Sequence, residues 1–355
     1  QAYWYFSLYI CHNNNGDKMK NRELKFTRIY YEPSIKNYEL GKFLIKKYEK
    51  LPKIEINSHN NIEELRKYEN KDFAKLKRYL ILGIRKTHKY TPNYKISDYL
   101  VPFTSSGCYA MCMYCYLVCN YNKCSYLRVF VNKEEILDRL IKFSNNSDKE
   151  LVFEIGSNSD LLLENLVTNS LKENIEYFLE KTSKGKLTFP TKFSYIEPLL
   201  EISDKKRVLP RMSLNPQNII EKVEFGTSSF DERINAINKL ASAGYKTYIL
   251  IAPVILTDTY KEDYTNLIEE LKERLSKEAK VDITFEVIFM TYSYVHRKIN
   301  EEAFPKALKL YNPNLMTLRG IGKYHYKSNI KEEAKKFIED LITNNFKNCK
   351  IKYIV

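Results

Sequence analysis

The chain has 355 residues and a mass of 42.1 kDa, with 44% hydrophobic and 29% charged side chains, which excludes a disordered or collagen-like protein and fits about two domains. The 58 Lys and Arg residues outnumber the 44 Asp and Glu residues, and the net charge of +14 favours a polyanionic partner such as nucleic acid. Abundant Lys, Asn, Ile and Tyr with only 10 Gly is also typical of AT-rich coding, so charge alone leaves nucleic-acid binding open.

Apolar runs and cysteine usage indicate the compartment. The longest apolar runs, Ala2 to Ile10 and Tyr248 to Leu256, each cover nine residues, about half of what a membrane-spanning helix needs. The first run lacks the basic region and the cleavage site of a secretory signal. Five of the seven cysteines fall within seventeen positions, which indicates metal ligation under reducing conditions. We therefore predict a cytoplasmic protein without membrane segments.

The first eighteen residues contain no Met and have no clear relation to the sequence that follows. Gly16-Asp17-Lys18-Met19 can be encoded by a purine-rich stretch before a start codon, which is typical of a ribosome-binding site. We interpret residues 1–18 as a non-native or upstream-translated segment and expect the natural protein to start at Met19.

Residues 19–99 predict a small N-terminal α/β domain. Strand-like pieces at Phe26 to Tyr31 and Tyr79 to Gly83 alternate with polar helical stretches such as Gly41 to Lys50.

Residues 100–290 alternate apolar strand-like runs with amphipathic helical stretches six times. Such alternation predicts parallel strands joined by right-handed crossovers, and six units are too few for a complete eight-unit barrel. We therefore predict an α/β fold with a partial (β/α)6 TIM-like barrel. The predicted strands are Leu100–Phe103, Leu151–Ile155, Leu187–Phe193, Val208–Leu214, Thr247–Val254 and Ile283–Met290, and the helical stretches include Lys133–Phe143, Asp231–Ala243 and Tyr260–Ala279.

The carboxyl ends of the predicted strands should gather a site, because parallel α/β folds place their functional residues there. The side chains that follow or end these strands are Ser157, Ser159, Lys192, Ser213, Asn215, Ala252 and Pro253.

Residues 291–355 form a C-terminal extension with two recognisable parts. The basic and aromatic stretch Arg319 to Lys327 predicts a hairpin, and Ile330 to Thr343 predicts a helix that leads to a final short strand.

Three cysteines suggest an iron-sulfur site. Cys108-Tyr-Ala-Met-Cys112-Met-Tyr-Cys115 has the spacing C-x3-C-x2-C and follows the first predicted barrel strand. Three thiolates can hold three irons of a 4Fe-4S cluster, and the fourth iron then remains open to a ligand. An amino-acid moiety can chelate that iron through its amine and carboxylate, which is how S-adenosylmethionine binds in radical enzymes.

A zinc knuckle completed by Cys119 or Cys124 is the alternative interpretation. Zinc sites favour two separate C-x2-C pairs, whereas four residues separate Cys119 from Cys124, so the spacing favours the cluster. Both cysteines can also be read as small buried hydrophobic residues, and Cys349 as a packing residue.

The cysteine loop Thr104-Ser-Ser-Gly-Cys-Tyr-Ala-Met-Cys-Met-Tyr-Cys-Tyr-Leu117 resembles that of the spore photoproduct lyase family, radical S-adenosylmethionine enzymes that repair DNA. The resemblance covers nearly the whole chain after Met19. Further segments that resemble the family, in the same order, are Gly83–Thr87, Tyr126–Asn132, Thr191–Phe193, Phe225–Ser228, Ala243–Tyr245, Ile251–Pro253 and Gly320–Tyr324.

This resemblance implies a radical SAM partial barrel and cleavage of the thymine dimer 5-thyminyl-5,6-dihydrothymine to two thymines. A 5'-deoxyadenosyl radical would remove a hydrogen from the dimer, the bond between the bases would break, and a hydrogen would return to the product. The matching positions imply that Cys108, Cys112 and Cys115 ligate the cluster. They imply an S-adenosylmethionine pocket lined by Ser159, Ser213 and Ala252, with Lys192 at the carboxylate. Tyr114 and Tyr116 match the tyrosines that relay the radical. Aromatic packing around the cluster is the alternative role for the two tyrosines.

The chain departs from the family at Ser157, where the family has the cysteine that donates hydrogen to the thymine radical. A serine O–H bond is too strong for that donation, so another thiol must serve or the chemistry differs. Cys119 and Cys124 are the candidate substitutes. A second departure is Leu318-Arg319, where the family has Arg-Tyr.

DNA contact is expected at the predicted hairpin, since a radical inside the protein reaches a dimer only after the lesion leaves the duplex. Arg319, Lys323 and Tyr324 are the candidate DNA-binding residues, and a solvated edge hairpin is the alternative.

Two other functions stay open at this point: a radical enzyme of the same family with a different substrate, and a noncatalytic metal-stabilised DNA-binding protein. The favoured function implies UV-damaged DNA as partner, a reducing electron donor such as flavodoxin or ferredoxin, a monomer, and a spore-forming bacterium as the source.

Overall fold

The computed structural model describes residues 23–120 and 125–355, so the predictions for residues 1–18 and for Cys124 lie outside the described residues. The strands are β1 (Arg28–Tyr31), β2 (Lys53–Glu55), β3 (Tyr79–Gly83), β4 (Thr91–Pro92), β5 (Tyr99–Leu100), β6 (Ser105–Ser106), β7 (Met111–Cys112), β8 (Leu127–Phe130), β9 (Val152–Glu154), β10 (Lys186–Thr191), β11 (Val208–Leu214), β12 (Glu224–Phe225), β13 (Tyr248–Val254), β14 (Thr284–Phe289), β15 (Tyr292–Ser293), β16 (Met316–Leu318), β17 (Lys323–Tyr326) and β18 (Lys350–Ile354).

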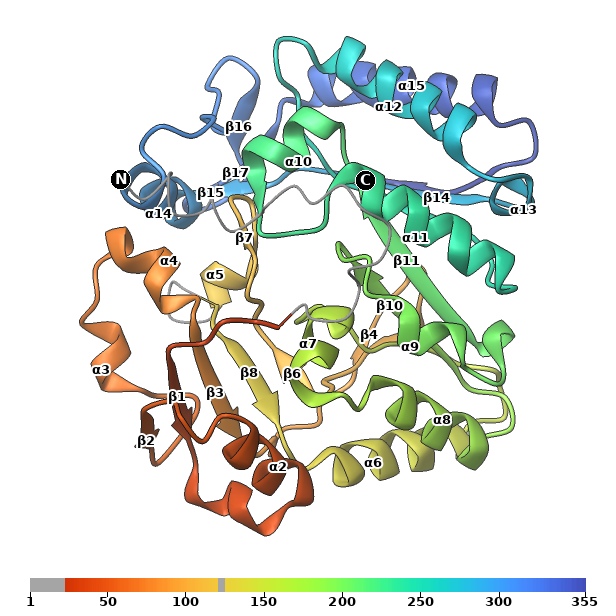
Figure 1. The fold of residues 1–355 in the computed structure, drawn as a ribbon. Helices are drawn as coiled ribbons and strands as arrows, with labels where there is room; N and C mark the ends of the chain where they lie inside the picture. Colours follow the sequence, from red (N-terminus) through yellow and green to blue (C-terminus); the bar gives the residue numbers. More distant parts are fainter. Residues whose placement is uncertain (1–22, 121–124) are drawn as a thin grey trace, which may run out of the picture.

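Helices connect and cover these strands (Figure 1). They are α2 (Glu39–Lys47), α3 (Glu63–Arg66), α4 (Phe73–Leu76), α5 (Leu117–Asn120), α6 (Lys133–Asn145), α7 (Leu161–Thr168), α8 (Leu171–Lys181), α9 (Glu197–Leu200), α10 (Gln217–Val223), α11 (Phe230–Ser242), α12 (Tyr260–Arg274), α13 (Lys277–Lys280), α14 (Tyr294–Ala303) and α15 (Ser328–Asn345). None of the helices in the described part of the chain combines the length and the apolar character that crossing a membrane requires.

The main sheet has eight strands in the order β18-β14-β13-β11-β10-β9-β5-β4. The six strands predicted for the barrel correspond to β5, β9, β10, β11, β13 and β14, which are neighbours and pair in parallel, so the partial (β/α)6 barrel is confirmed. Two strands not assigned to the barrel extend it, because β18 joins β14 in parallel and β4 joins β5 in antiparallel.

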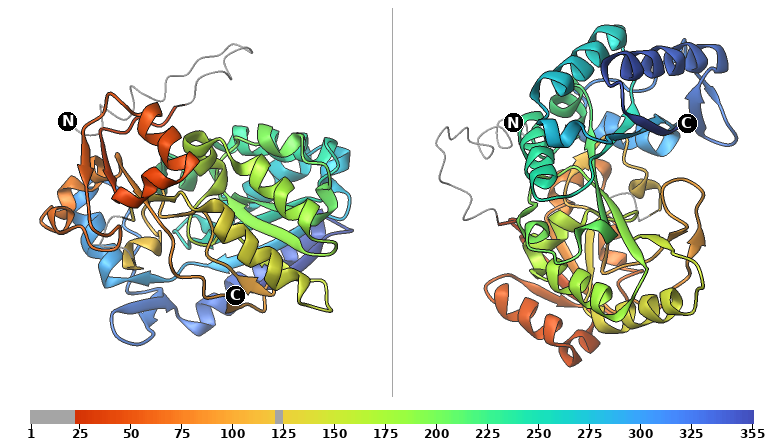
Figure 2. Two further views of the ribbon diagram at one scale, coloured as in Figure 1. Left: turned by 90° about the horizontal axis from the view of Figure 1, so that it is seen from below. Right: turned by 90° about the vertical axis from the view of Figure 1, so that its right-hand side faces the viewer.

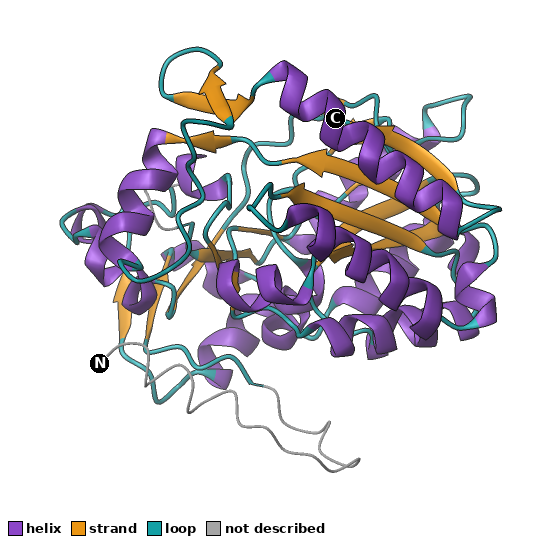
Figure 3. Ribbon diagram, turned by 90° about the horizontal axis from the view of Figure 1, so that it is seen from above, coloured by secondary structure: helices purple, strands orange, loops and turns teal. Residues whose placement is uncertain are grey.

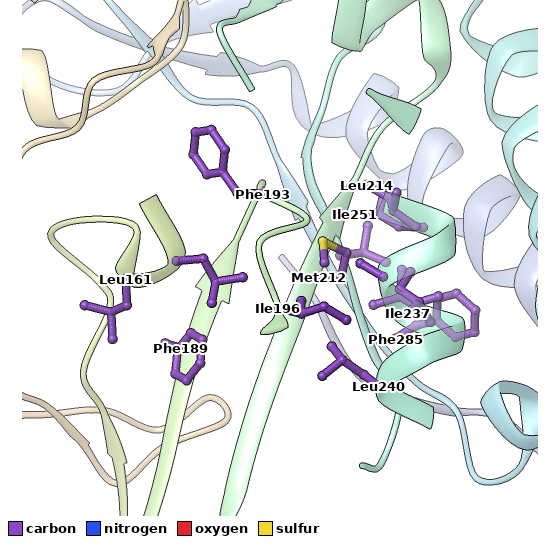
Figure 4. Packing of buried hydrophobic residues seen from close by; sticks show 14 of the residues in the cluster. Leu161, Phe189, Phe193, Ile196, Met212, Leu214, Ile237, Leu240, Ile251 and Phe285 are labelled. Carbon is purple, nitrogen blue, oxygen red and sulfur yellow. The ribbon is translucent and has the colours of Figure 1, made fainter. Parts of the chain in front are cut away.

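The core of the molecule lies between this sheet and the helices on its outer side (Figure 3). Met212 and Phe285 are buried on the side where α11 presents Ile237 and Leu240, and Phe189 is buried on the side of Leu161 (Figure 4). Each such side chain contributes roughly 1.5–3 kcal/mol through burial, and together they fix the strands whose carboxyl ends carry the site.

A second sheet, in the order β2-β1-β3-β8-β6, spans the predicted boundary at residue 99. Its strands β1 and β3 confirm the predicted strand-like pieces, while β8 and β6 come from the segment after residue 99 and pair with β3 and β8 respectively. The domain boundaries 19–99, 100–290 and 291–355 stay predictions. The pairing of this sheet continues across the boundary at residue 99. Figure 2 shows β1 and α2 at one end of the molecule and α15 at the other.

The C-terminal extension contains the predicted hairpin and helix. β16 and β17 pair in antiparallel, β15 adds a third strand, and α15 covers the predicted helix. The predicted helical stretch Tyr260–Ala279 is interrupted near its end: α12 ends at Arg274, and α13 begins after Ser276, whose side chain accepts a hydrogen bond from the backbone of Ala279. A serine cap of this kind starts a new helix rather than continuing the old one.

Candidate active site

The cysteine loop is held against the carboxyl end of β9. Gly107 has φ of +77°, and a Cβ there would lie 1.7 Å from the carbonyl oxygen of Tyr126, so only glycine fits. Its backbone N–H donates to the carbonyl of Asn158 at 2.7 Å. Further along, β7 pairs with β12, which places Cys112 opposite Glu224. The loop is therefore held at Gly107 and at Cys112.

Cys108, Cys112 and Cys115 are free cysteines that are half-buried as residues, with thiol groups largely removed from water. Burial raises the pKa of all three, that of Cys108 to about 12, while the ammonium of Lys77 lowers the pKa of Cys108 and Cys115, and that of Lys192 lowers the pKa of Cys112 and Cys115. Negative charge on Cys108 or Cys115 raises the pKa of Cys112, so the thiols are near neighbours. Buried thiols beside cations fit an anionic, thiolate-ligated group.

Cys119 is exposed, and its thiol contacts the segment of β15 and α14. Its Sγ lies 3.4 Å from Ser293 Oγ and 3.7 Å from His296 Nε2, both from the segment of β15 and α14. Within residues 23–120 and 125–355, no three His, Cys, Asp or Glu side chains are arranged to hold a single metal ion. This geometry gives no support to a zinc knuckle completed by Cys119.

Lys192 directly follows β10, and its side chain reaches residues near the carboxyl ends of β11 and β13. Its Nζ donates to Ser213 Oγ at 2.6 Å and to the carbonyl of Ala252 at 2.9 Å. Ser213 Oγ also donates to that carbonyl at 3.2 Å. The ends of β10, β11 and β13 thus bring together three of the four residues predicted for the S-adenosylmethionine pocket.

The fourth predicted pocket residue, Ser159, has a buried hydroxyl oxygen without a hydrogen-bond partner among the described residues. Its neighbour Asp160 caps α7 and accepts hydrogen bonds from Thr191 Oγ1 at 2.9 Å and from the backbone N–H of Lys192 at 2.9 Å. The loop after β9 is thereby tied to the end of β10. A buried hydroxyl without a protein partner, such as that of Ser159, is usually satisfied by a ligand or a water.

Glu224 is the residue of this centre that the sequence did not reveal. It is fully buried and accepts hydrogen bonds from Lys192 Nζ at 3.1 Å, from Arg233 at 2.7 Å and from Asn215 at 2.9 Å. Burial by itself would raise the pKa of Glu224, but the charges of Lys192 and Arg233 and hydrogen bonds from Tyr114 and Asn215 lower it to about 2. Glu224 therefore stays ionised. Its position next to Phe225–Ser228, a segment that resembles the family, was the available signal.

Tyr114 and Tyr116 lie on either side of Cys115 and have different surroundings. Tyr114 donates a hydrogen bond to Glu224, and the Lys192 ammonium lies 5.4 Å from the centre of its ring. Tyr116 is 51% exposed and donates to the backbone carbonyl of Ser157. The structure thus brings Tyr116 and Ser157 together through the backbone of Ser157.

The predicted DNA-contacting residues lie on the hairpin of β16 and β17. The backbone N–H of Arg319 donates to the carbonyl of Lys323 at 2.8 Å and closes the turn, in which Gly320 adopts φ of +85°. Arg319 and Lys323 are exposed, whereas Tyr324 is half-buried with its ring 4.7 Å from that of Tyr311. The two cations are accessible to a phosphate backbone, and the ring of Tyr324 packs against Tyr311.

Comparisons with known proteins point to one family. Its model, described as spore photoproduct lyase, matches residues 25–355. A spore photoproduct lyase from Bacillus subtilis (strain 168) is 33% identical over 334 residues, which cover 92% of this chain and 97% of that protein. A spore photoproduct lyase from Geobacillus sp. (strain Y412MC61) is 31% identical over 339 residues, again covering 92% and 97%.

Solved structures agree with the sequence comparison. A spore photoproduct lyase complexed with dinucleoside spore photoproduct superposes with a TM-score of 0.86 at 30% identity, covering 94% of this chain and all of the other. A mutant with bound AdoMet (S-adenosylmethionine) and dinucleoside spore photoproduct gives a TM-score of 0.85 at 30% identity, with coverage of 93% and 99%. The predicted barrel type is confirmed by these structures.

Proposed function

The chain belongs to the spore photoproduct lyase family and is a radical S-adenosylmethionine enzyme that repairs the spore photoproduct in DNA, and from this premise we propose how its own residues divide the reaction. The proposal rests on the hydrogen-bonded group of Lys192, Ser213, Ala252 and Glu224. This group adjoins the cysteine loop because Glu224 lies opposite Cys112 in the pairing of β12 with β7. The ammonium of Lys192 is thus held in place next to the segment that carries the three thiols.

Cys108, Cys112 and Cys115 would hold the iron-sulfur cluster. The buried thiols, their cationic neighbours and the rigid loop fit a 4Fe-4S cluster with one iron left open. When bound and reduced, the cluster with S-adenosylmethionine supplies a 5'-deoxyadenosyl radical. The task of the protein is to orient S-adenosylmethionine and to keep water from the radical.

Lys192 would bind the carboxylate of S-adenosylmethionine. Its three oxygen partners hold the ammonium at the strand ends, so the side chain loses little conformational entropy on binding. Ser159, Ser213 and Ala252 would line the same pocket. The unpartnered hydroxyl of Ser159 is available to a polar group of the ligand, and this supports the assignment.

The return of hydrogen to the product must use a route other than position 157. Ser157 has no thiol, and Tyr116 donates to its backbone carbonyl rather than to its hydroxyl. We assign the relay to Tyr114 and Tyr116. The donating thiol would be Cys119, whose backbone N–H donates to the carbonyl of Tyr116 at 3.0 Å, or Cys124, which lies outside the described residues.

The hairpin of β16 and β17 would hold UV-damaged DNA. Exposed Arg319 and Lys323 can contact phosphates near the lesion, and half-buried Tyr324, held by Tyr311, can support the opened step. An already damaged step costs least to open. A low-potential donor such as flavodoxin or ferredoxin would deliver the electron. We further propose that the enzyme acts as a monomer in the cytoplasm of a spore-forming bacterium.

Anaerobic reconstitution with iron and sulfide tests the cluster assignment. The wild-type chain should bind about four irons and cleave S-adenosylmethionine under reduction, as expected for a cluster of this type. Cys112→Ala should lose both properties, whereas Cys349→Ala, at a cysteine outside the loop, should keep them. Cleavage at the wild-type rate by Cys112→Ala would refute the assignment.

A further inference from the structure

A buried lysine contacts the cysteine loop from the side of α4. Lys77 follows that helix directly and is only 2% exposed. Its Nζ donates to the backbone carbonyl of Cys108 at 2.6 Å, to Ser125 Oγ at 2.8 Å and to the backbone carbonyl of Ser125 at 3.2 Å. Ser125 itself has φ of +48° and is fully buried, so the lysine binds a segment with an uncommon backbone conformation.

All three partners of Lys77 are neutral. In the described part of the chain no Asp or Glu oxygen lies within ion-pair distance of its Nζ. Burying an ammonium without a counter-charge costs several kcal/mol, so such a group is expected beside an anion. Lys192, the other ammonium near the thiols, already has Glu224 as its counter-ion.

The cysteine loop, which would present thiolates to a bound cluster, is the candidate counter-charge for Lys77. Lys77 binds the carbonyl of Cys108 directly, and its charge lowers the pKa of both Cys108 and Cys115 against the effect of burial. Three thiolates around a 4Fe-4S cluster form an anionic group, and reduction adds one further negative charge. Neighbouring charge is one of the factors that set the potential of such a cluster.

We propose that Lys77 is a positioning residue that supplies the buried counter-charge of the cluster and so favours its one-electron reduction. This inference rests on the proposed function, because it requires the cluster at Cys108, Cys112 and Cys115. The electron comes from the external reductant. Its contacts with Cys108 and Ser125 hold the charge at a fixed place beside the loop.

The test compares Lys77→Met, Lys77→Gln and Lys77→Arg with the wild type, each as the full chain reconstituted anaerobically with iron and sulfide. Iron content and the midpoint potential, from a redox titration followed by electron paramagnetic resonance, are the readouts. In the Met and Gln variants the ratio of reduced to oxidised cluster at a given solution potential should fall by about tenfold, since a nearby buried charge is removed. Lys77→Arg should keep the wild-type potential, and so should Lys75→Met, which removes a lysine two residues away whose side chain is not buried.

A wild-type potential in the Met or Gln variant that carries a full cluster would overturn the inference while leaving the proposed function intact. If neither neutral variant takes up iron, Lys77→Arg is the deciding variant. Full iron loading with the wild-type potential in Lys77→Arg supports the need for a buried cation. Failure of Lys77→Arg to take up iron overturns the inference. A wild-type chain without a cluster would overturn the proposed function itself, and this inference with it.

Discussion

The ammonium of Lys192 lies 3.1 Å from the carboxylate of Glu224, which also binds Arg233 at 2.7 Å. Lys192 follows β10 at the pocket proposed for S-adenosylmethionine, and Glu224 lies on β12, the strand that pairs with β7 at Cys112. One buried carboxylate therefore links the pocket to the cysteine loop, so a displacement of either one changes the contacts of the other.

Glu224→Gln removes the negative charge that two buried cations share. We expect a loss of unfolding free energy of about 3 kcal/mol, because Lys192 and Arg233 stay buried with less compensation. Affinity for S-adenosylmethionine should also fall. Urea unfolding and equilibrium dialysis measure the two effects, and Glu221→Gln, an exposed glutamate three residues earlier, should change stability by less than about 0.5 kcal/mol. Equal stability of the two variants would contradict the role given to Glu224.

Glu164 predicts a pH dependence of stability. Burial raises its pKa from 4.5 to about 7, despite a hydrogen bond from Ser105. The folded state then binds the proton more tightly than the unfolded state, so the contribution of Glu164 to stability is highest below pH 4.5 and falls as the pH rises to 7. The loss corresponds to about 3 kcal/mol. Glu164→Gln lacks this titration and should gain that amount relative to wild type between about pH 4 and pH 8.

Unfolding by urea at several pH values checks this prediction, with Glu269→Gln, an exposed glutamate on α12, as the control. Asp160, whose pKa burial raises to about 6, titrates in both proteins and cancels in the comparison. If the difference in unfolding free energy between wild type and Glu164→Gln does not change with pH, burial does not raise the pKa of Glu164.

The identity of the hydrogen donor can be tested at Cys119. If its thiol returns hydrogen to the product radical, Cys119→Ala should divert part of the product from thymine to a trapped side product, while Cys349→Ala gives clean repair. Ser157→Cys in the Cys119→Ala background should restore clean repair by placing a thiol beside Tyr116. Chromatography of the reaction products distinguishes these outcomes, and unchanged product from Cys119→Ala would exclude this thiol and leave Cys124.

The hairpin charges predict a salt effect on DNA binding. Replacing Arg319 and Lys323 together by Ala should weaken binding at all sequences and reduce the slope of log affinity against log salt by about 2, because each cation that binds a phosphate adds roughly one to that slope. Cleavage of S-adenosylmethionine without DNA should be unaffected. Lys239→Ala on α11 is the matched control, and an unchanged slope in the double variant would place the DNA elsewhere.

The sequence predicted the parts of this protein that depend on local pattern. Six apolar runs with amphipathic stretches between them indicated the barrel strands, because period and length distinguish strands from helices. The rule that parallel strands present their site at carboxyl ends brought Lys192, Ser213 and Ala252 to one place, and the structure joins them by hydrogen bonds.

The features that it did not predict depend on pairing between distant segments. Glu224 and Arg233 read as ordinary charged residues, and only the fold shows that they form a fully buried pair. The same holds for Lys77, whose partners Cys108 and Ser125 lie 31 and 48 positions away. Periodicity carries no information about which charges are removed from water together.

Repair of a defined oligonucleotide tests whether the enzyme cleaves the spore photoproduct. The anaerobically reconstituted protein is incubated with S-adenosylmethionine, a reductant and an oligonucleotide that contains one spore photoproduct, and the nucleosides are quantified after digestion. We predict loss of the dimer with the appearance of two thymidines for each dimer, and no conversion by Cys112→Ala. An intact dimer in a reaction in which the wild-type protein cleaves S-adenosylmethionine would contradict repair of the spore photoproduct by this enzyme.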